Sequence, residues 1–200
     1  PHIYTSIPSE EDRYALFRLN ATLFRRDVST TIIQDDKVPY QKLRKRMIKK
    51  ASKAGLILNE VNDFSSYWNL LSEVLVKEHG VKPVHTFEEI DSLRRAFPNN
   101  IVCHSISYEG KVIAGVVLFI TENVIHCQYI AASDDARKIG ALDYLIDHLI
   151  NEVYQEVKYF DFGTSNEDSG RKLNEGLIFQ KEGFGARAVV HDFYEIEIND

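Results

Sequence analysis

Alternating apolar and polar residues predict three consecutive strands in the middle of the chain, at about 101–108, 111–120 and 124–132. Glu109-Gly110 and the segment 121–123 separate them, and both are short enough to be hairpin turns. Strands joined by such turns run antiparallel. The middle of the chain is therefore predicted to form an antiparallel meander.

Apolar residues spaced by three and four predict helices on both sides of this meander. Phe64, Trp68, Leu71 and Leu75 follow that spacing in a helix at about 63–79. Further helices are predicted at about 8–20, 39–55, 86–97, 134–155 and 171–180, and further strands at about 22–33, 56–61, 157–162 and 186–198. This order predicts an α+β fold, in which a parallel pair of strands beside the long helix creates a cleft suited to phosphates.

The composition indicates a globular chain. Of its 200 residues, 44% are hydrophobic and 27% are charged, which excludes disordered and fibrous classes. No apolar run reaches the roughly 18 residues that cross a bilayer, so we expect no stable membrane insertion and no signal peptide. The only cysteines, Cys103 and Cys127, are too few for a disulfide scaffold, which favours a cytoplasmic setting.

A metal site is not expected. Cys103-His104 and His126-Cys127 place cysteine and histidine side by side in predicted strands. Because side chains alternate along a strand, each cysteine and its neighbouring histidine are sent to opposite faces of the sheet.

Positive charge is concentrated in one segment. Of the 24 Lys and Arg residues, eight lie between positions 37 and 53, where there is no Asp or Glu: Lys37, Lys42, Arg44, Lys45, Arg46, Lys49, Lys50 and Lys53. On a helical wheel, one face carries Lys42, Lys45, Arg46, Lys49 and Lys53, and the opposite face carries Leu43, Met47, Ala51 and Ala54. The segment is either a solvated basic face or a surface for a phosphate-bearing partner.

Arg44 falls with the apolar residues of that helix. We therefore expect its guanidinium either to be paired inside the protein or to point into a cleft.

The junction before the predicted helix at 134–155 is a candidate phosphate site. Arg137, Lys138 and Gly140 lie there, and free N–H groups at a helix start favour phosphate oxygens. Gly140 would let the backbone approach a ligand closely. The alternative is that Asp134-Asp135 simply caps the helix and complements its dipole.

From residue 64 onwards, the order of elements resembles the GNAT acyltransferase superfamily, with its mixed, mostly antiparallel central sheet flanked by helices. The segment 179–184, Phe-Gln-Lys-Glu-Gly-Phe, is similar to the Tyr-x-Lys-x-Gly-Phe ending of a superfamily helix. The segment 137–142, Arg-Lys-Ile-Gly-Ala-Leu, partly matches the Gln/Arg-x-x-Gly-x-Gly/Ala loop that holds the pyrophosphate of coenzyme A. Leu142 stands where the superfamily has a small residue.

A second resemblance covers the basic segment. Residues 45–56 resemble the connecting helix that leads into the second GNAT-like domain of Fem-type peptidyltransferases and related polysaccharide-locus acyltransferases. Asp161-Phe162-Gly163 and the segment 181–185 also resemble patterns of those proteins. The resemblance implies a remnant of an N-terminal domain plus the connecting helix at 1–55, a GNAT-like domain at 56–200, and a further N-terminal part missing in cis.

The resemblance implies an N-acyltransferase without a tightly bound cofactor. Its co-substrate would be acyl-CoA or aminoacyl-tRNA, and its acceptor an amine on an anionic, nucleotide-linked or other small molecule of cell-envelope or polysaccharide-precursor type. It also implies a bulge within 128–132 whose N–H groups polarise the donor carbonyl. The alternative is a catalytically silent GNAT-like module that binds an anionic glycan precursor or RNA.

The candidate site residues follow from this resemblance and from the charge pattern. The catalytic candidates are Asp161, Glu167 and Tyr129. The cofactor-binding candidates are Gln128, Ile130, Arg137, Lys138, Gly140, Ala141, Asn174 and Lys181. The substrate-binding candidates are Arg44, Arg46, Lys49, Lys50, Ser165 and Asn166.

The general base and general acid stay open. Asp168 and His126 are further candidate bases, and Asp161 is alternatively a carboxylate that binds the backbone of the turn at 163–164. Phe179 stands where the superfamily often has a tyrosine acid, so a different acid is needed or the leaving group needs none. The polar loop at 165–170 is either functional or an ordinary turn and helix cap.

Overall fold

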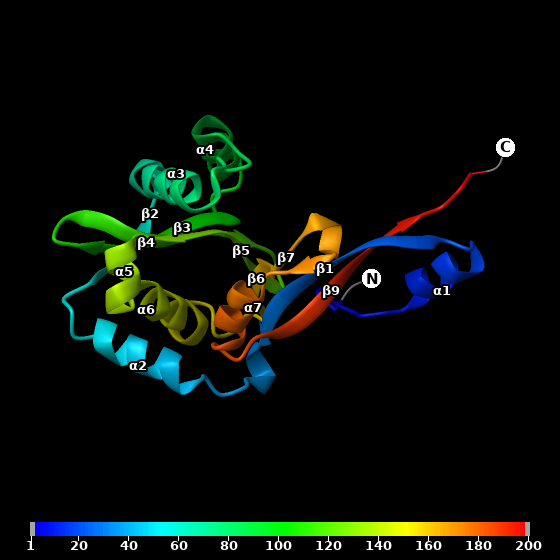
Figure 1. Cartoon of the computed structure of the whole chain (residues 1–200), viewed down its shortest axis with the longest axis horizontal. Helices are drawn as coiled ribbons and strands as arrows, with labels where there is room; N and C mark the ends of the chain where they lie inside the picture. Colours follow the sequence, from blue (N-terminus) through cyan, green and yellow to red (C-terminus); the bar gives the residue numbers. More distant parts are fainter. Residues whose placement is uncertain (1–2, 199–200) are drawn as a thin grey trace. The chain divides into compact units, whose positions relative to one another are not determined.

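The computed structural model describes residues 3–198, apart from the side chain of His79, and groups them into two compact units (Figure 1). The middle unit comprises residues 40–121 and 125–156. The terminal unit comprises the described residues up to 39, residues 122–124 and the described residues from 157 onwards. The predicted division at 55/56 stays a prediction.

The middle unit is built on an antiparallel sheet. Its strands lie in the order β2 (Ile57–Val61), β3 (Ile101–Tyr108), β4 (Lys111–Ile120) and β5 (Val124–Ala132). Its helical elements are α2 (Lys42–Ala51), α3 (Ser65–His79), α4 (Phe87–Ala96), α5 (Asp134–Ile139), α6 (Ala141–His148) and the π-helical turn η2 (Leu149–Val153). The predicted meander is confirmed.

The helices of this unit cover both faces of its sheet. Helices α3 and α4 lie on one face, and α5, α6 and α2 lie on the other (Figure 1). On the α3 face, Phe64, Tyr67 and Trp68 pack with Cys103 in a buried cluster. His104 instead contacts Tyr154, which follows η2, so neighbouring strand residues point to opposite faces as predicted. Among the described residues, no group of three or more metal-ligating side chains is arranged to hold an ion.

The single helix predicted at 134–155 is wrong. Helix α5 ends at Ile139 and α6 starts at Ala141, because Gly140 adopts a left-handed conformation with φ of 81°. A Cβ atom at Gly140 would lie 2.7 Å from the carbonyl oxygen of Met47 in α2, so a glycine is required there. Ser133 caps α5 by accepting a hydrogen bond from the N–H of Ala136 at 3.2 Å, so Asp134-Asp135 occupies the first turn and is not the cap.

The terminal unit contains three long antiparallel strands of the seven-stranded sheet. Its strands lie in the order β6 (Tyr159–Thr164), β1 (Thr22–Ile33) and β9 (Arg187–Glu195), and β1 and β9 run side by side as a long ribbon (Figure 1). The other elements are α1 (Glu11–Arg18), η1 (Gln34–Asp36), β7 (Asn166–Glu167), η3 (Asp168–Gly170), β8 (Lys172–Leu173) and α7 (Glu175–Glu182). The helix predicted at 171–180 starts later because β7 and β8 form a hairpin ahead of it.

The predicted α+β class, with a mostly antiparallel sheet flanked by helices, is confirmed. None of the helices within residues 3–198 combines the length and the apolar content that crossing a bilayer requires.

Candidate active site

Strand β5 contains a bulge at Gln128. Val117 pairs with Tyr129 and Leu118 pairs with Cys127, so Gln128 is an extra residue without a partner on β4. A bulge interrupts the hydrogen-bond ladder, re-aims side chains and is common next to active sites. The bulge predicted within 128–132 is therefore present, and the candidate residues Gln128, Tyr129 and Ile130 lie at it.

The hydroxyl of Tyr129 binds His85, which lies in the loop between α3 and α4. Nδ1 of His85 is 2.6 Å from this hydroxyl, and the backbone N–H of His85 donates to the same oxygen at 3.2 Å. Tyr129 is 8% exposed, whereas His85 is half-buried. The contact orients the imidazole through Nδ1 and leaves Nε2 without a partner among the described residues.

Sequence analysis missed His85. Its position is fixed from behind by a capping box, in which Thr86 accepts from Glu89 N–H and donates its own N–H to the Glu89 carboxylate. The capping box predicts where α4 begins, but no local pattern links this loop to strand β5. Only the tertiary fold brings His85 to Tyr129.

Tyr67 supports the bulge from α3. Its hydroxyl donates to the carbonyl oxygen of Tyr129 at 3.0 Å, and the ring of Trp68 packs edge-on against Tyr129 with a centroid distance of 5.2 Å. The ring of Tyr67 lies over Gly115, where a Cβ atom would be 2.5 Å from it. The bulge is therefore held in place by packed side chains.

The junction between α5 and α6 is filled by the protein itself. Gly140 and Ala141 are buried, and the close approach that Gly140 permits is made by the Met47 carbonyl. In the first turn of α6, the Asp143 carboxylate accepts a hydrogen bond from Arg44. Burial raises the pKa of the Asp143 carboxyl, and the Arg44 guanidinium opposes this shift. Arg44 is thus paired inside the protein, one of its two predicted alternatives.

The cations near this junction have carboxylate partners. Arg137 pairs with Glu78, and Lys138 pairs with Asp135 at 2.9 Å. Their role in binding a cofactor stays a prediction. A ligand would have to compete with these carboxylates for Arg137 and Lys138.

Helix α2 packs through a face slightly rotated from the predicted one. Arg44, Met47, Ile48 and Ala51 are its less exposed residues, whereas Leu43, predicted to lie opposite the cations, is 37% exposed. Lys50 donates to the carbonyl oxygen of Lys138 at 2.7 Å. Five further cations of α2 and the turn after it have no partner among the described residues, and we call them the basic surface: Lys42, Lys45, Arg46, Lys49 and Lys53.

In the terminal unit, Asp161 is buried and fully engaged. Its carboxylate accepts hydrogen bonds from the hydroxyls of Ser29 and Thr31 and, at 3.1 Å, from Gly163 N–H. The bond to Gly163 is the backbone contact that the sequence offered as the alternative to catalysis. The hydroxyl of Tyr4 binds Thr31 in the same cluster, and burial raises the pKa of Tyr4.

The other candidates in this unit make local contacts. Glu167 is exposed and binds Lys172 at 2.8 Å and Asn174 at 3.2 Å. The Asn174 side chain also caps α7. Asn166 binds Val28 N–H and the Asp27 carboxylate, which ties the hairpin to β1.

Besides Asp161, two candidate residues of this unit are almost fully buried. Lys181 donates to the carbonyl oxygens of Gly163 and Thr164 at 2.9 and 2.7 Å, which stabilises the end of β6. The Ser165 hydroxyl is buried and has no hydrogen-bond partner within residues 3–198. The predicted roles of both in binding stay predictions.

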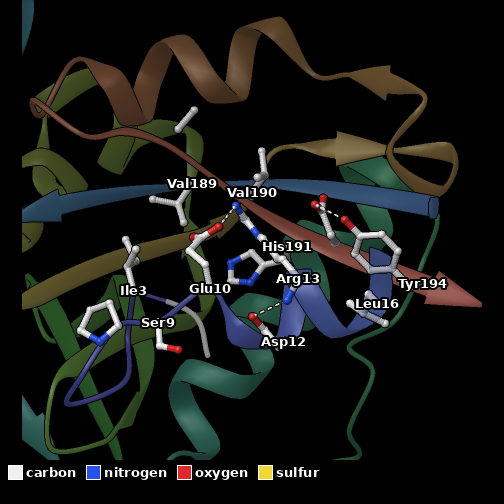
Figure 2. Close-up of a pocket in the computed structure, with 13 residues that line it drawn as sticks. Ile3, Ser9, Glu10, Asp12, Arg13, Leu16, Val189, Val190, His191 and Tyr194 are labelled. Atoms are coloured by element: carbon white, nitrogen blue, oxygen red, sulfur yellow. Dashed lines mark hydrogen bonds and ion pairs between the residues drawn. The ribbon is translucent and has the colours of Figure 1, made fainter. Parts of the chain in front are cut away.

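A cavity of about 520 Å³ in the terminal unit lies between the segment around α1 and strand β9 (Figure 2). Glu10, Arg13 and His191 project toward one another in it. Arg13 pairs with Glu10 at 3.0 Å, and Asp192 is held by Arg26 through two hydrogen bonds. These opposite charges already satisfy one another, and none of the predicted site residues lines this cavity.

The fold and the β5 bulge are those that the resemblance to GNAT acyltransferases predicts. Residues 41–169 match the family model described as the acetyltransferase (GNAT) domain. The chain belongs to this family, because the match covers well over half of its length. The coarse prediction of transferase activity is thereby supported. No curated protein sequence matches the chain.

Several solved structures share the fold at low sequence identity. FemX has a TM-score of 0.72 and 9% identity over 96% of this chain and 69% of its own. L-PGS from Bacillus licheniformis has a TM-score of 0.62 and 16% identity, over 92% of this chain and 63% of its own. The C-terminal domain (DUF2156) of a putative lysylphosphatidylglycerol synthetase from Agrobacterium fabrum has a TM-score of 0.64 and 13% identity, over 90% of this chain and 64% of its own. The chain thus spans about two thirds of the length of these structures.

Proposed function

We propose that the chain is an N-acyltransferase domain that moves an acyl or aminoacyl group to an amine on an anionic acceptor of cell-envelope or polysaccharide-precursor type. The observation that carries the proposal is the bulge at Gln128 with the Tyr129–His85 pair beside it. Backbone N–H groups at a bulge stabilise a developing oxyanion. An imidazole within reach accepts the proton that an attacking amine loses.

The reaction proceeds by direct attack. The neutral amine forms a C–N bond to the donor carbonyl carbon, and the oxyanion accepts hydrogen bonds at the bulge. Nε2 of His85 takes the proton from the nitrogen, and collapse of the intermediate breaks the bond to the leaving oxygen or sulfur. His85 then passes this proton to the leaving group. The imidazole thereby acts as the general acid, a role that the phenyl ring of Phe179 cannot fill.

The packing of the α5–α6 junction favours aminoacyl-tRNA over acyl-CoA as the donor. Met47 occupies the close approach at Gly140, and Arg44, the cation beside the start of α6, is already paired with Asp143. The unpartnered cations of the basic surface suit a polyanionic donor. The similar structure from Agrobacterium fabrum is described as part of a putative lysylphosphatidylglycerol synthetase, whose named product joins a lysyl group to an anionic lipid, and this agrees with aminoacyl transfer to an anionic acceptor.

Labelled donors test the proposal. The purified chain is incubated with glucosamine 1-phosphate as an anionic amine probe and with either radiolabelled acetyl-CoA or radiolabelled aminoacyl-tRNA. Label is expected in the amine from the tRNA ester alone. Transfer from acetyl-CoA would overturn the choice of donor, and no transfer from either donor to this probe or to a lysine peptide would overturn the transferase proposal.

The basic surface also supports the alternative of a silent module that binds RNA. Reversing Lys45, Arg46 and Lys49 to Glu should weaken tRNA binding more than 10-fold and make it less salt-dependent, because each phosphate contact releases counterions. Reversing the exposed cations Lys82, Lys111 and Arg171 gives the same change in net charge and is the matched control. Strong binding of tRNA without any transfer would favour the silent module.

A further inference from the structure

A second cavity, of about 490 Å³, lies in the middle unit, where strands β2 and β3 meet the first turn of α3. None of the predicted site residues lines it. Its polar lining consists of Asn59, Glu60, Asn62, Asp63, Ser66, Tyr67, Ser105 and Ser107. The cavity thus combines hydroxyls, amides and two carboxylates.

Ser105 is the buried residue that points to a ligand. It is 1% exposed, it lines the cavity, and its hydroxyl has no hydrogen-bond partner among the described residues. An unpartnered buried hydroxyl is destabilising, and native proteins keep few of them. A ligand in the cavity would supply the missing hydrogen bond.

Neighbouring groups on β2 and β3 also offer hydrogen bonds. The Asn59 amide donates to the Ser107 hydroxyl at 3.2 Å and to the Ile57 carbonyl oxygen at 3.2 Å. Its donors are thereby used, while its own carbonyl oxygen and the proton of Ser107 are left for a ligand.

Strand β4 has a bulge beside this cavity. Ile106 pairs with Ala114 and Ser107 pairs with Val112, so Ile113 is an extra residue on β4. A bulge next to a cavity is a common way to turn side chains toward a bound molecule.

The charges of the lining exclude an anion. Of the residues that the structure describes, no Lys or Arg lines the cavity, whereas Glu60 and Asp63 do. The backbone N–H of Ser65 donates to Asp63 at 2.9 Å, and this bond lowers the pKa of Asp63, so its carboxylate stays charged. Phosphate or carboxylate groups would be repelled here, while uncharged hydroxyls find both donors and acceptors.

We propose that this cavity binds an uncharged, hydroxyl-rich ligand of the sugar class, with the Ser105 hydroxyl as a buried contact. Tyr67, which also supports the β5 bulge, is part of the lining, but the proposal depends on the cavity alone and holds whether or not the chain transfers an acyl group.

Titration of the isotope-labelled chain with glucose and with N-acetylglucosamine, followed by amide NMR shifts, tests the site. At least one sugar is expected to shift the amides of Ser105, Ser107 and Asn59, and glucose 6-phosphate to shift them less. Ser105→Ala should weaken this binding three- to tenfold without lowering the stability of the free chain, because it removes a hydroxyl that has no partner.

The matched control is Thr30→Val in the terminal unit, which removes another buried hydroxyl that has no partner in the described part of the chain. It should leave sugar binding unchanged. Absence of shifts at these amides with both sugars would overturn the site, as would equal weakening by both variants. If Ser105→Ala perturbs the whole spectrum, Ser107→Ala takes its place, and unchanged binding in that variant would count against the site.

Discussion

Two histidine–tyrosine pairs lie on opposite faces of the same sheet in the middle unit. On the α3 face, Nδ1 of His85 is 2.6 Å from the Tyr129 hydroxyl. On the α6 face, Nε2 of His104 is 2.8 Å from the Tyr154 hydroxyl. The two contacts are chemically alike, but their surroundings differ.

His104 is 5% exposed, and burial, with a smaller contribution from His148, lowers its pKa to about 4. It therefore stays neutral at physiological pH and has no route to a substrate. His85 is half-buried in a loop next to the Gln128 bulge. Access to a reacting group, and not the contact itself, distinguishes a candidate base from a structural histidine.

The largest expected effect is on catalysis from the α3 face. His85→Gln should lower kcat/KM for amine transfer about 100- to 1000-fold, because general base catalysis contributes on that order. His104→Gln, on the other face, should change kcat/KM less than about threefold. The labelled-donor assay with a stability check on each variant measures both.

Tyr129→Phe refines this prediction. Removing the hydroxyl leaves the imidazole but frees its orientation, so a smaller loss of about 10-fold is expected. Equal losses in the His85 and His104 variants would show that the two pairs do not differ in function.

The next largest effect is on stability from the α6 face. Arg44→Met removes the partner of Asp143, and the two side chains are only 13% and 10% exposed. Leaving a nearly buried carboxylate unpaired should lower the free energy of unfolding by about 3 kcal/mol. Chemical denaturation at neutral pH measures this change.

The double variant Arg44→Met with Asp143→Asn is the control. It removes the charge that the single variant leaves unpaired, so it should recover part of the lost stability. If the double variant is no more stable than the single one, the ion pair does not explain the loss of stability in Arg44→Met, and Arg44 acts through packing alone.

Local patterns predicted most elements of the fold. The meander and the helix at 63–79 follow from alternation and from apolar spacing, which depend only on neighbouring residues. The break at Gly140 was missed because it depends on a carbonyl oxygen of α2, far away in the sequence. Patterns within one segment cannot include the surface against which that segment packs.

The candidate site was predicted to a smaller extent. The β5 bulge and Tyr129 came from a family resemblance. His85 carries no local signal, and the partner of Arg44 lies 99 positions further along the chain. The close approach expected between Gly140 and a phosphate is instead made between Gly140 and the Met47 carbonyl. A glycine permits either contact, so the sequence alone does not distinguish them.

Gly140→Ala tests whether the junction on the α6 face is built for packing. Its φ of 81° and the clash with the Met47 carbonyl should together lower the free energy of unfolding by about 2 to 3 kcal/mol. Gly55, with φ of 70° and nothing within 4 Å of a Cβ atom, is the matched control. Gly55→Ala should lower it by only about 1 kcal/mol.

A similar loss in both glycine variants would mean that the left-handed conformation, and not the contact with α2, requires a glycine at the junction. Thermal and chemical denaturation of the two variants beside the unsubstituted chain separate these cases.

The smallest expected effect is the pH dependence that His104 gives to stability. Its pKa falls from an ordinary value of 6.5 to about 4 on folding, so between these values the unfolded chain binds a proton that the folded chain does not. The contribution of His104 to the free energy of unfolding is therefore fully present above about pH 6.5 and declines as the pH falls toward 4. Between pH 7 and 4.5 the decline should be about 2 kcal/mol.

Comparison with His104→Gln isolates this contribution from that of the carboxylates, which titrate in the same range. The variant cannot bind the proton, so its free energy of unfolding should fall by about 2 kcal/mol less than that of the unsubstituted chain over the same pH interval. If His104→Gln and the unsubstituted chain lose the same stability on acidification, His104 is accessible to protons in the folded state, and the contrast between the two histidine–tyrosine pairs fails.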